Sequence, residues 1–230
     1  MVAGIIKRIG LIVVCAAALL ALAGCQSTPA GGPSRSVFTR PARTVYFFQH
    51  GDAATWQVFT TPDEAALFRV SDGALEGAVL ADRGYIWSLN GVEHDDVIAS
   101  AAVQLTQGAP GSALGLICRA DAHGNGYYFL IASDGTFSIS VGTDARNDLF
   151  QLVPWQASSA VRPGTQPNTL RIVCVENYLA LFVNDVFVAE TFDDEFRRGQ
   201  LGAALGAVET TAWARFDNIA VQPAYMVGAR

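Results

Sequence analysis

The sequence predicts an all-β protein, a jelly-roll sandwich of two antiparallel sheets. Apolar and polar residues alternate with period two from Thr44 onward, and turn-forming residues interrupt this pattern about every eight to twelve positions. Beyond residues 1–25, no run has a helical period longer than about a turn and a half. Some fourteen candidate strands are more than the roughly seven of an immunoglobulin sandwich, and their number favours a jelly roll.

Composition and charge exclude two classes of protein. Half of the 230 residues are apolar (51%) and only 16% are charged, which excludes a disordered chain. The net charge is −6, and residues 1–25 contribute Lys7 and Arg8 without an acid, so the remainder carries −8. Such a surface repels phosphate backbones and anionic headgroups, and we expect no nucleic-acid partner.

Residues 1–25 have the pattern of an export signal. Lys7 and Arg8 precede an apolar run over residues 9–21, which is too short for a stable membrane span. The run ends in Leu22-Ala23-Gly24-Cys25, which resembles the lipobox of bacterial lipoproteins. The resemblance implies a diacylglycerol thioether on Cys25, cleavage before it, and a cell-envelope protein anchored to the membrane by lipid. Ordinary secretion with an unmodified Cys25 is the alternative.

The rest of the chain divides into three parts. Residues 26–43 are rich in Ser, Pro, Gly and Arg with almost nothing to bury, and they predict a flexible linker. Residues 44–222 carry the strand pattern and form the expected domain. Residues 223–230 are predicted to be a C-terminal tail.

The clearest predicted strand covers residues 136–141. Its Phe137, Ile139 and Val141 share one face, while Ser138 and Ser140 lie on the other, which we expect to be solvated. The other predicted strands cover residues 46–49, 56–60, 67–70, 74–80, 85–89, 96–107, 112–119, 127–132, 149–155, 170–175, 178–183, 186–191, 200–207 and 213–221.

Three short turns connect neighbouring strands as hairpins. They are Ser133-Asp134-Gly135, Glu176-Asn177 and Asn184-Asp185, whose residue types supply local hydrogen bonds and tolerate positive φ. The last two turns predict a meander over residues 170–191.

Two cysteines remain after Cys15 leaves with the signal and Cys25 takes lipid. Cys118 alternates in phase with Leu116, and Cys174 with Ile172, so both face the apolar side of their strands. In an exported protein this predicts a Cys118–Cys174 disulfide. Two buried free thiols are the alternative, and a metal pair is weaker because neither neighbourhood offers two further ligands.

The order of several strand motifs resembles the concanavalin A-like lectin/glucanase superfamily, with the laminin-G-like domains and the related domain of keto-disaccharide hydrolases as the nearest branches. The likeness spans about residues 44–222 and lies in residues 114–119, 126–131, Asp134-Gly135, 170–175, 181–184 and 215–221. It implies two antiparallel sheets, one of them concave, and proteins that commonly bind or cut saccharides. Some members of the superfamily bind calcium.

Catalytic motifs of that superfamily are missing. Its enzymatic branches carry Glu-x-Asp-x-x-Glu on one strand, and this sequence has no such run. The two acid clusters, Glu93-His94-Asp95-Asp96 and Asp193-Asp194-Glu195, are expected in turns as solvated residues, with a calcium site as the alternative. No nucleophile or zinc motif surrounds the histidines. We therefore assign no catalytic residue.

The loop over residues 119–127 is the most polar segment between two strong strands. Sugar recognition requires planar amides or carboxylates for hydroxyl pairs and an aromatic face for the ring's C–H groups. The candidate binding residues are Asp121, His123, Asn125, Tyr127, Trp87 and Trp155. Alternatively, the aromatic residues belong to the core, and Asp121 and Asn125 only build the turn.

These observations favour a lipid-anchored protein with a non-catalytic, carbohydrate-binding domain. A divergent glycoside hydrolase is the second hypothesis. A structural or assembly lipoprotein that binds another envelope protein is the third.

Overall fold

The computed structural model describes residues 31–49, 54–81, 83–143 and 149–227. Within these ranges the chain forms β-strands and no helix, so the described part contains no helix that could span a membrane. The predicted signal peptide and Cys25 lie outside the described residues.

Sixteen strands make up the described fold. They are β1 (Val37–Thr39), β2 (Thr44–Tyr46), β3 (Phe59–Thr60), β4 (Ala66–Ser71), β5 (Ala74–Val79), β6 (Tyr85–His94), β7 (Val97–Gln107), β8 (Ala113–Ala120), β9 (Gly126–Ala132), β10 (Thr136–Gly142), β11 (Phe150–Ala157), β12 (Asn168–Val175), β13 (Tyr178–Val183), β14 (Val186–Phe192), β15 (Gly199–Gly206) and β16 (Ala212–Met226).

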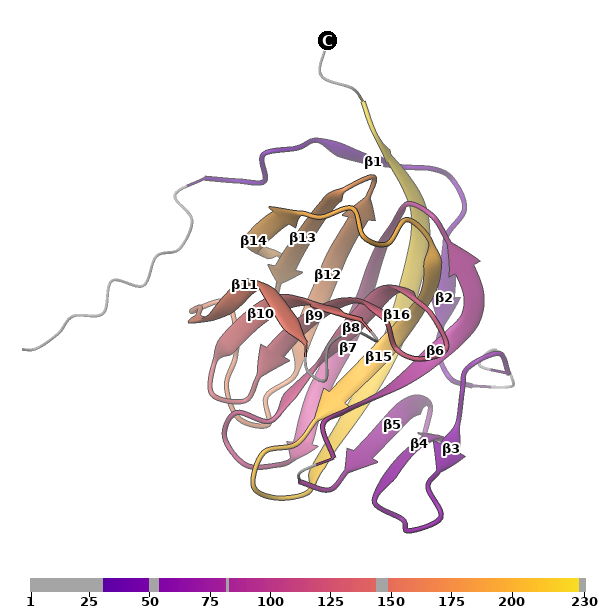
Figure 1. Ribbon diagram of the computed structural model, residues 1–230, viewed down its shortest axis with the longest axis vertical. Helices are drawn as coiled ribbons and strands as arrows, with labels where there is room; N and C mark the ends of the chain where they lie inside the picture. The colour runs from indigo at the N-terminus through magenta and orange to yellow at the C-terminus, as the bar shows by residue number, and fades with distance from the viewer. Residues whose placement is uncertain (1–30, 50–53, 82, 144–148, 228–230) are drawn as a thin grey trace, which may run out of the picture.

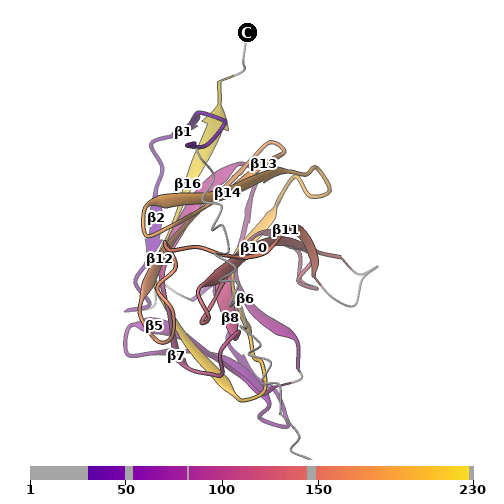
Figure 2. The ribbon, with the colours of Figure 1, turned by 90° about the vertical axis from the view of Figure 1, so that its left-hand side faces the viewer.

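The strands form two antiparallel sheets stacked as layers (Figures 1 and 2). The ten-stranded sheet has the order β14-β13-β12-β7-β16-β5-β4-β3, and β1 and β2 also pair with β16. The six-stranded sheet has the order β11-β10-β9-β8-β15-β6. The predicted jelly-roll sandwich is confirmed.

Alternate residues of both sheets fill the space between the layers. Phe129 of β9, Phe68 of β4 and Phe216 of β16 are among the most deeply buried side chains. The predicted Cys118–Cys174 disulfide lies in this core and joins β8 of one sheet to β12 of the other, with a Cα–Cα distance of 6.8 Å. It closes a segment of 56 residues, for which loop entropy gives about 4 kcal/mol of stabilisation.

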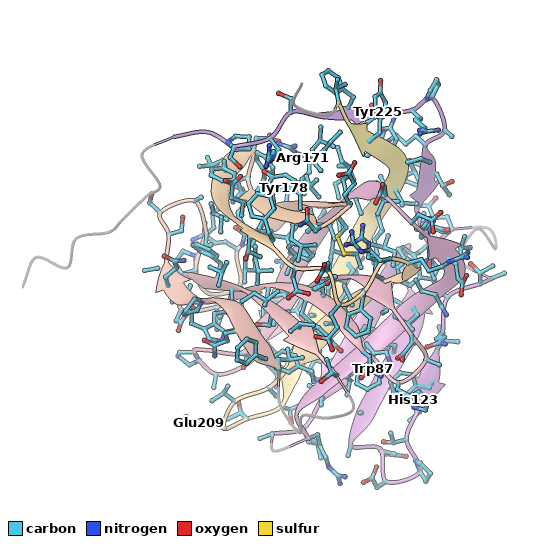
Figure 3. All side chains as sticks on the ribbon, turned by 45° about the horizontal axis from the view of Figure 1, so that its top comes forward. Trp87, His123, Arg171, Tyr178, Glu209 and Tyr225 are labelled. Atoms are coloured by element: carbon cyan, nitrogen blue, oxygen red, sulfur yellow. A yellow bond between two sulfur atoms is a disulfide. The ribbon has the colours of Figure 1, made fainter. Side chains whose placement is uncertain are left out.

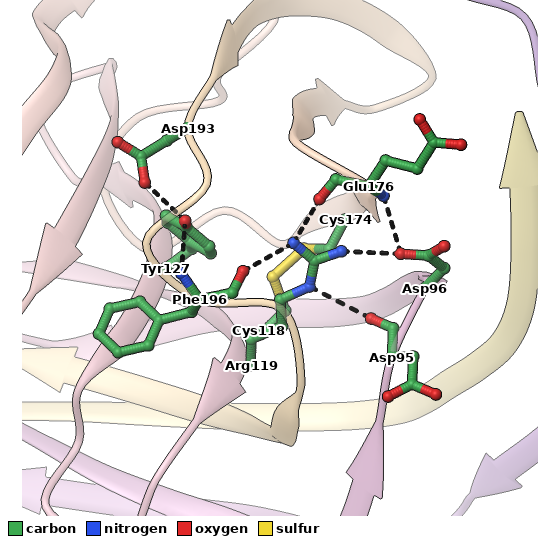
Figure 4. Close-up of a disulfide and its surroundings, with 9 residues drawn as sticks. All are labelled: Asp95, Asp96, Cys118, Arg119, Tyr127, Cys174, Glu176, Asp193 and Phe196. Atoms are coloured by element: carbon green, nitrogen blue, oxygen red, sulfur yellow. Dashed lines mark hydrogen bonds and ion pairs between the residues drawn. A yellow bond between two sulfur atoms is a disulfide. The ribbon is translucent and has the colours of Figure 1, made fainter. Parts of the chain in front are cut away.

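A buried arginine next to the disulfide connects three loops (Figure 4). Arg119 is 2% exposed, and its guanidinium donates to the carbonyls of Asp95, Glu176 and Phe196 and to the Asp96 carboxylate, at 2.7–3.2 Å. A buried charge needs this number of partners to offset its desolvation. Arg119 and the disulfide therefore fix one edge of the sandwich together.

The predicted hairpins are confirmed, and their residues act as expected. The Asp134 carboxylate accepts the Thr136 N–H at 3.0 Å, and Gly135 adopts a φ of 91°. Glu176 and Asn184 have positive φ values of 53° and 50° in the turns that flank β13.

The linker and tail boundaries differ from the expectation. Residues 37–39 of the predicted linker form β1, which pairs with residues 224–226 of the predicted tail as an extension of β16. Val37 and Met226 pack on an apolar cluster on the outer face of the ten-stranded sheet, and this burial holds both segments in place. We call residues 34–43 the N-terminal strap.

Two local expectations are wrong. Ser138 and Ser140 are almost fully buried, at 0% and 2% exposed, and the Ser138 hydroxyl donates at 2.9 Å to the Val153 carbonyl of β11, whose pairing with β10 contains bulges. Glu93 and His94 do not lie in a turn, because β6 continues to His94.

Candidate functional site

A cleft of about 440 Å³ lies on the outer face of the six-stranded sheet. Its lining has four aromatic rings, from Tyr85, Trp87, Tyr128 and Trp155, and polar groups from the loop after β8 and from β10 and β11. The other lining residues are Gly84, His123, Gly124, Asn125, Leu130, Ser140, Gly142, Thr143, Leu149 and Gln151.

Strand alternation directs the aromatic rings outward. Ile86 of β6 packs against the main core, so its neighbours Tyr85 and Trp87 point to the opposite face. Phe129 of β9 is likewise in the core, and Tyr128 points outward. The Tyr85 and Tyr128 rings are 6.2 Å apart between centroids, at 60° to each other.

Small residues on β15 let aromatic rings lie close to the sheet. A Cβ at Gly206 would come within 2.7 Å of the Tyr85 ring, so this side chain lies directly over the β15 backbone. The neighbouring Ala204 belongs to the same outer cluster as Tyr128. The glycine-rich sequence of β15 thus supplies a flat surface beneath the rings.

The loop at one side of the cleft is built around the Asp121 carboxylate. It accepts the backbone N–H groups of His123 and Asn125 at 2.8 and 3.0 Å and the Asn125 side-chain amide at 2.8 Å. Burial alone would raise the pKa of Asp121, but these hydrogen bonds outweigh it and lower that pKa below its ordinary value. Asp121 therefore holds Asn125 in position.

Gly124 brings this loop onto the cleft's aromatic wall. Its φ of 82° suits glycine, and a Cβ there would lie 2.7–2.9 Å from three atoms of the Trp87 indole. Its carbonyl accepts the Tyr128 hydroxyl at 2.6 Å. The loop and two aromatic side chains are thus mutually positioned.

The tyrosines of the cleft remain protonated at neutral pH. Burial raises the pKa of Tyr85 to about 12 and raises the pKa of Tyr128 as well. Both hydroxyls keep their protons, and that of Tyr128 is committed to Gly124.

Four of the six predicted binding residues line the cleft: Trp87, His123, Asn125 and Trp155. Figure 3 shows Trp87 and His123 together, far from Tyr225. Asp121 does not line the cleft but supports its loop.

Tyr127 does not join the cleft. Its ring is in the main core, and its hydroxyl donates to Asp193 at 2.6 Å and accepts the Phe196 N–H at 3.0 Å. Alternation explains this, because Tyr127 shares the inward face of β9 with Phe129.

The lining residues that sequence reasoning missed include Tyr85, Tyr128 and Gln151. Strand alternation could have predicted both tyrosines. Tyr85 lies two residues before Trp87 and therefore shares its face of β6, and Tyr128 is adjacent to the inward-facing Phe129 and therefore points outward. Gln151 lies directly before bulges in β11, and no sequence pattern marked these bulges.

The acids that the structure describes near this face form neither a cluster for calcium nor a glycosidase pair. Among the described lining residues none is Asp or Glu. Asp96 pairs with Arg119, Glu93 with Arg198 at 2.7 Å, and Asp193 with the Tyr127 hydroxyl. No group of three or more His, Cys, Asp or Glu residues in the described ranges could hold a metal ion. The acid clusters stabilise loops.

Comparison with known proteins supports the fold. No family model matches the sequence, and neither does any curated protein. Among solved structures, carbohydrate-binding module CBM66 from Bacillus subtilis superposes with a TM-score of 0.60 at 15% identity, over 73% of this chain and 95% of that one.

Two further structures show the same likeness. A galectin-like protein of unknown function from Bacillus subtilis gives a TM-score of 0.58 at 12% identity, over 84% of this chain and 100% of that one. A GlcNAcα1-4Gal-releasing endo-β-galactosidase from Clostridium perfringens gives 0.54 at 10% identity, over 85% of this chain and 65% of that one. At these identities the comparison establishes a shared galectin-like jelly-roll fold.

Proposed function

We propose that the domain binds a carbohydrate chain in the cleft of the six-stranded sheet. The observation that carries the proposal is the grouping of Tyr85, Trp87, Tyr128 and Trp155 around one open hollow beside polar side chains. The solved structures that share the fold include a carbohydrate-binding module, which adds support.

The chemistry of the lining suits a sugar. Indole and phenol rings offer apolar faces to the C–H groups of a pyranose, and an amide offers a donor and an acceptor to adjacent hydroxyls. Asn125 and Gln151 supply such amides. Tyr85 supplies a hydroxyl that keeps its proton at neutral pH, because burial raises its pKa to about 12. A neutral sugar can be held by such groups without charged side chains.

We further propose that binding occurs without cleavage. Glycoside hydrolysis by the common mechanisms needs two carboxyl groups flanking the bond. The described lining supplies none, and the nearby Asp121 is committed to its loop by three hydrogen bonds.

The proposed site of action is the outer surface of a membrane, with Cys25 as the lipid anchor. The support is the predicted export signal and the lipobox-like sequence Leu22-Ala23-Gly24-Cys25. Mass spectrometry of the peptide that begins at Cys25 tests this directly, since acyl chains add a large mass. A Cys25→Ser variant should leave the membrane fraction.

The binding proposal is tested with a panel of oligosaccharides from common polysaccharides, measured by calorimetry. Trp87→Ala and Trp155→Ala should each weaken binding about tenfold or more, since an aromatic anchor is worth about 2 kcal/mol. Trp213→Ala is the matched control, because Trp213 is also half-buried but lies on β16 in the other sheet.

Three results would overturn parts of this proposal. No binding across the panel by the folded protein would reject carbohydrate recognition. An equal loss of affinity in the Trp213→Ala variant would reject this cleft. Release of new reducing ends from any oligosaccharide would reject binding without cleavage.

A further inference from the structure

The N-terminal strap pairs with the end of β16 and lies over the outer face of β12, β13 and β14. The Ser34 N–H donates to the Glu190 carboxylate at 2.8 Å, and the Arg40 N–H donates to the Pro223 carbonyl at 2.8 Å. Between these contacts β1 pairs with the end of β16. The chain therefore leaves the folded domain near Ser34, which is nine residues after Cys25.

This attachment limits how far the domain can lie from an anchored Cys25. Nine extended residues span at most about 30 Å, and a coil of that length averages roughly 15–18 Å. The face that carries the strap is thus kept close to the membrane that holds the lipid.

An exposed aromatic pair lies on the strap and its partner strand. Phe38 and Tyr225 stack with ring centroids 5.8 Å apart and are 46% and 39% exposed. The Arg40 guanidinium lies 5.5 Å from the Tyr225 ring centroid. We call Phe38, Arg40 and Tyr225 the strap patch.

The charge of the strap is opposite to that of the rest of the chain. Residues 34–43 contain Arg35, Arg40 and Arg43 and no acid, whereas residues 44–230 contain 10 basic and 21 acidic residues. A basic segment on an acidic protein orients that protein at an anionic surface, since only one side is attracted.

We propose that the strap patch docks on anionic lipid headgroups of the membrane that holds the Cys25 anchor. Phe and Tyr rings favour the headgroup level of a bilayer, and an arginine stacked on a ring can still donate its N–H groups to a phosphate. The proposal rests on the lipid anchor of the proposed function.

The consequence is a defined orientation of the glycan site. The strap lies on the outer face of the ten-stranded sheet, and the cleft on the outer face of the six-stranded sheet, with the core between them. Docking the strap patch on lipid turns the cleft away from the membrane, toward the space where a polysaccharide would be.

The test uses the full lipidated chain in phosphatidylcholine vesicles with or without phosphatidylglycerol, and with a fluorescence quencher on a fraction of the headgroups. A fluorophore is attached at Thr39→Cys, on β1, or at Ala157→Cys, on β11 of the other sheet. Both positions are exposed, and the disulfide and the acylated Cys25 leave the new thiol as the single target.

We expect the Thr39→Cys fluorophore to be quenched about twofold more than the Ala157→Cys fluorophore when phosphatidylglycerol is present, and less so at high salt. Arg35→Glu/Arg40→Glu should remove the difference. Arg197→Glu/Arg198→Glu changes the net charge equally at exposed residues outside the strap and should retain it.

The outcomes separate the docking from the anchor. A chain that fails to float with the vesicles rejects the lipid anchor, and the docking with it. A chain that floats while both fluorophores are quenched equally rejects the docking alone and leaves the anchor intact. Neither outcome bears on carbohydrate binding, which is measured without vesicles.

Discussion

The outer faces of the two sheets both carry aromatic residues, but only one is covered by the chain itself. On the ten-stranded sheet Tyr178 and Phe182 are 1% and 8% exposed, and Val37 of the strap and Met226 pack against their cluster. On the six-stranded sheet Trp87 and Trp155 are half-buried around an open cleft.

The comparison shows that aromatic content alone does not identify a binding face. The Tyr178 hydroxyl donates to Glu190 at 2.7 Å, and the same carboxylate accepts the strap's Ser34 N–H, so the polar groups of this face satisfy each other. In the cleft, rings lie beside amides at an open surface, where a ligand can use both. What the chain leaves uncovered is the better guide to function.

The largest expected effect concerns the Cys118–Cys174 disulfide, which joins the two sheets. Cys118→Ala/Cys174→Ala should lower the free energy of unfolding by about 4 kcal/mol, because the disulfide closes a 56-residue segment between the sheets. Urea unfolding of the variant and of the dithiothreitol-reduced native protein measures it, and the two should agree. Equal stability of oxidised and reduced protein would contradict this role.

Destabilising the packing of the strap on the ten-stranded sheet should leave the cleft of the six-stranded sheet intact. Val37→Asp places a carboxylate against the apolar cluster under the strap and should lower the free energy of unfolding by about 2 kcal/mol. Thr39→Asp, at an exposed position of the same strand, is the control and should cost little. Oligosaccharide affinity should be unchanged in both variants, and a parallel loss would show that the faces are not independent.

The open face can be disturbed through one glycine. Gly124→Ala would place a Cβ against the Trp87 ring and should cost about 1 kcal/mol in stability and weaken oligosaccharide binding. Gly164→Ala is a matched control, since Gly164 has a similar φ of 70° but open space around its Cβ position. Calorimetry should show weaker binding for Gly124→Ala alone. Similar affinities would mean that the Trp87 position is unimportant.

The smallest expected effect concerns His94, a half-buried histidine of β6. Burial lowers the pKa of His94, with Asp95 partly opposing the shift, and the His94 ring nitrogen lies 3.1 Å from the Asn90 amide. The unfolded chain therefore binds a proton more readily, and stability falls as pH drops from about 6.5 through the lowered pKa.

Thermal melts across this pH range measure the effect. His94→Gln should flatten the curve, because it removes the titrating group. A native curve that is flat between pH 4 and 7 would contradict the role of His94.

Period-two alternation predicted the sandwich and placed Cys118 and Cys174 on the inner face of their strands, while the residue types of the turns predicted the hairpins. The same rule could have placed Tyr127 in the core and Tyr128 in the cleft, since Phe129 fixes the phase of β9.

Other features depend on pairing over long separations. β1 is three residues long and is held by its pairing with the end of β16. No local pattern in residues 26–43 predicts this pairing. The burial of Ser138 follows from bulges in β11, and the role of Asp121 follows from hydrogen bonds within its loop. Local sequence indicated the strands but not what would cover them.

The most direct test of the central claim uses the four tryptophans as reporters. Trp87 and Trp155 line the cleft, Trp56 is in the core, and Trp213 lies in the other sheet. In an NMR titration with the tightest-binding oligosaccharide of the panel, the indole N–H signals of Trp87 and Trp155 should shift and saturate together, while those of Trp56 and Trp213 stay in place. Saturable shifts at Trp213 with Trp87 and Trp155 unchanged would contradict the account.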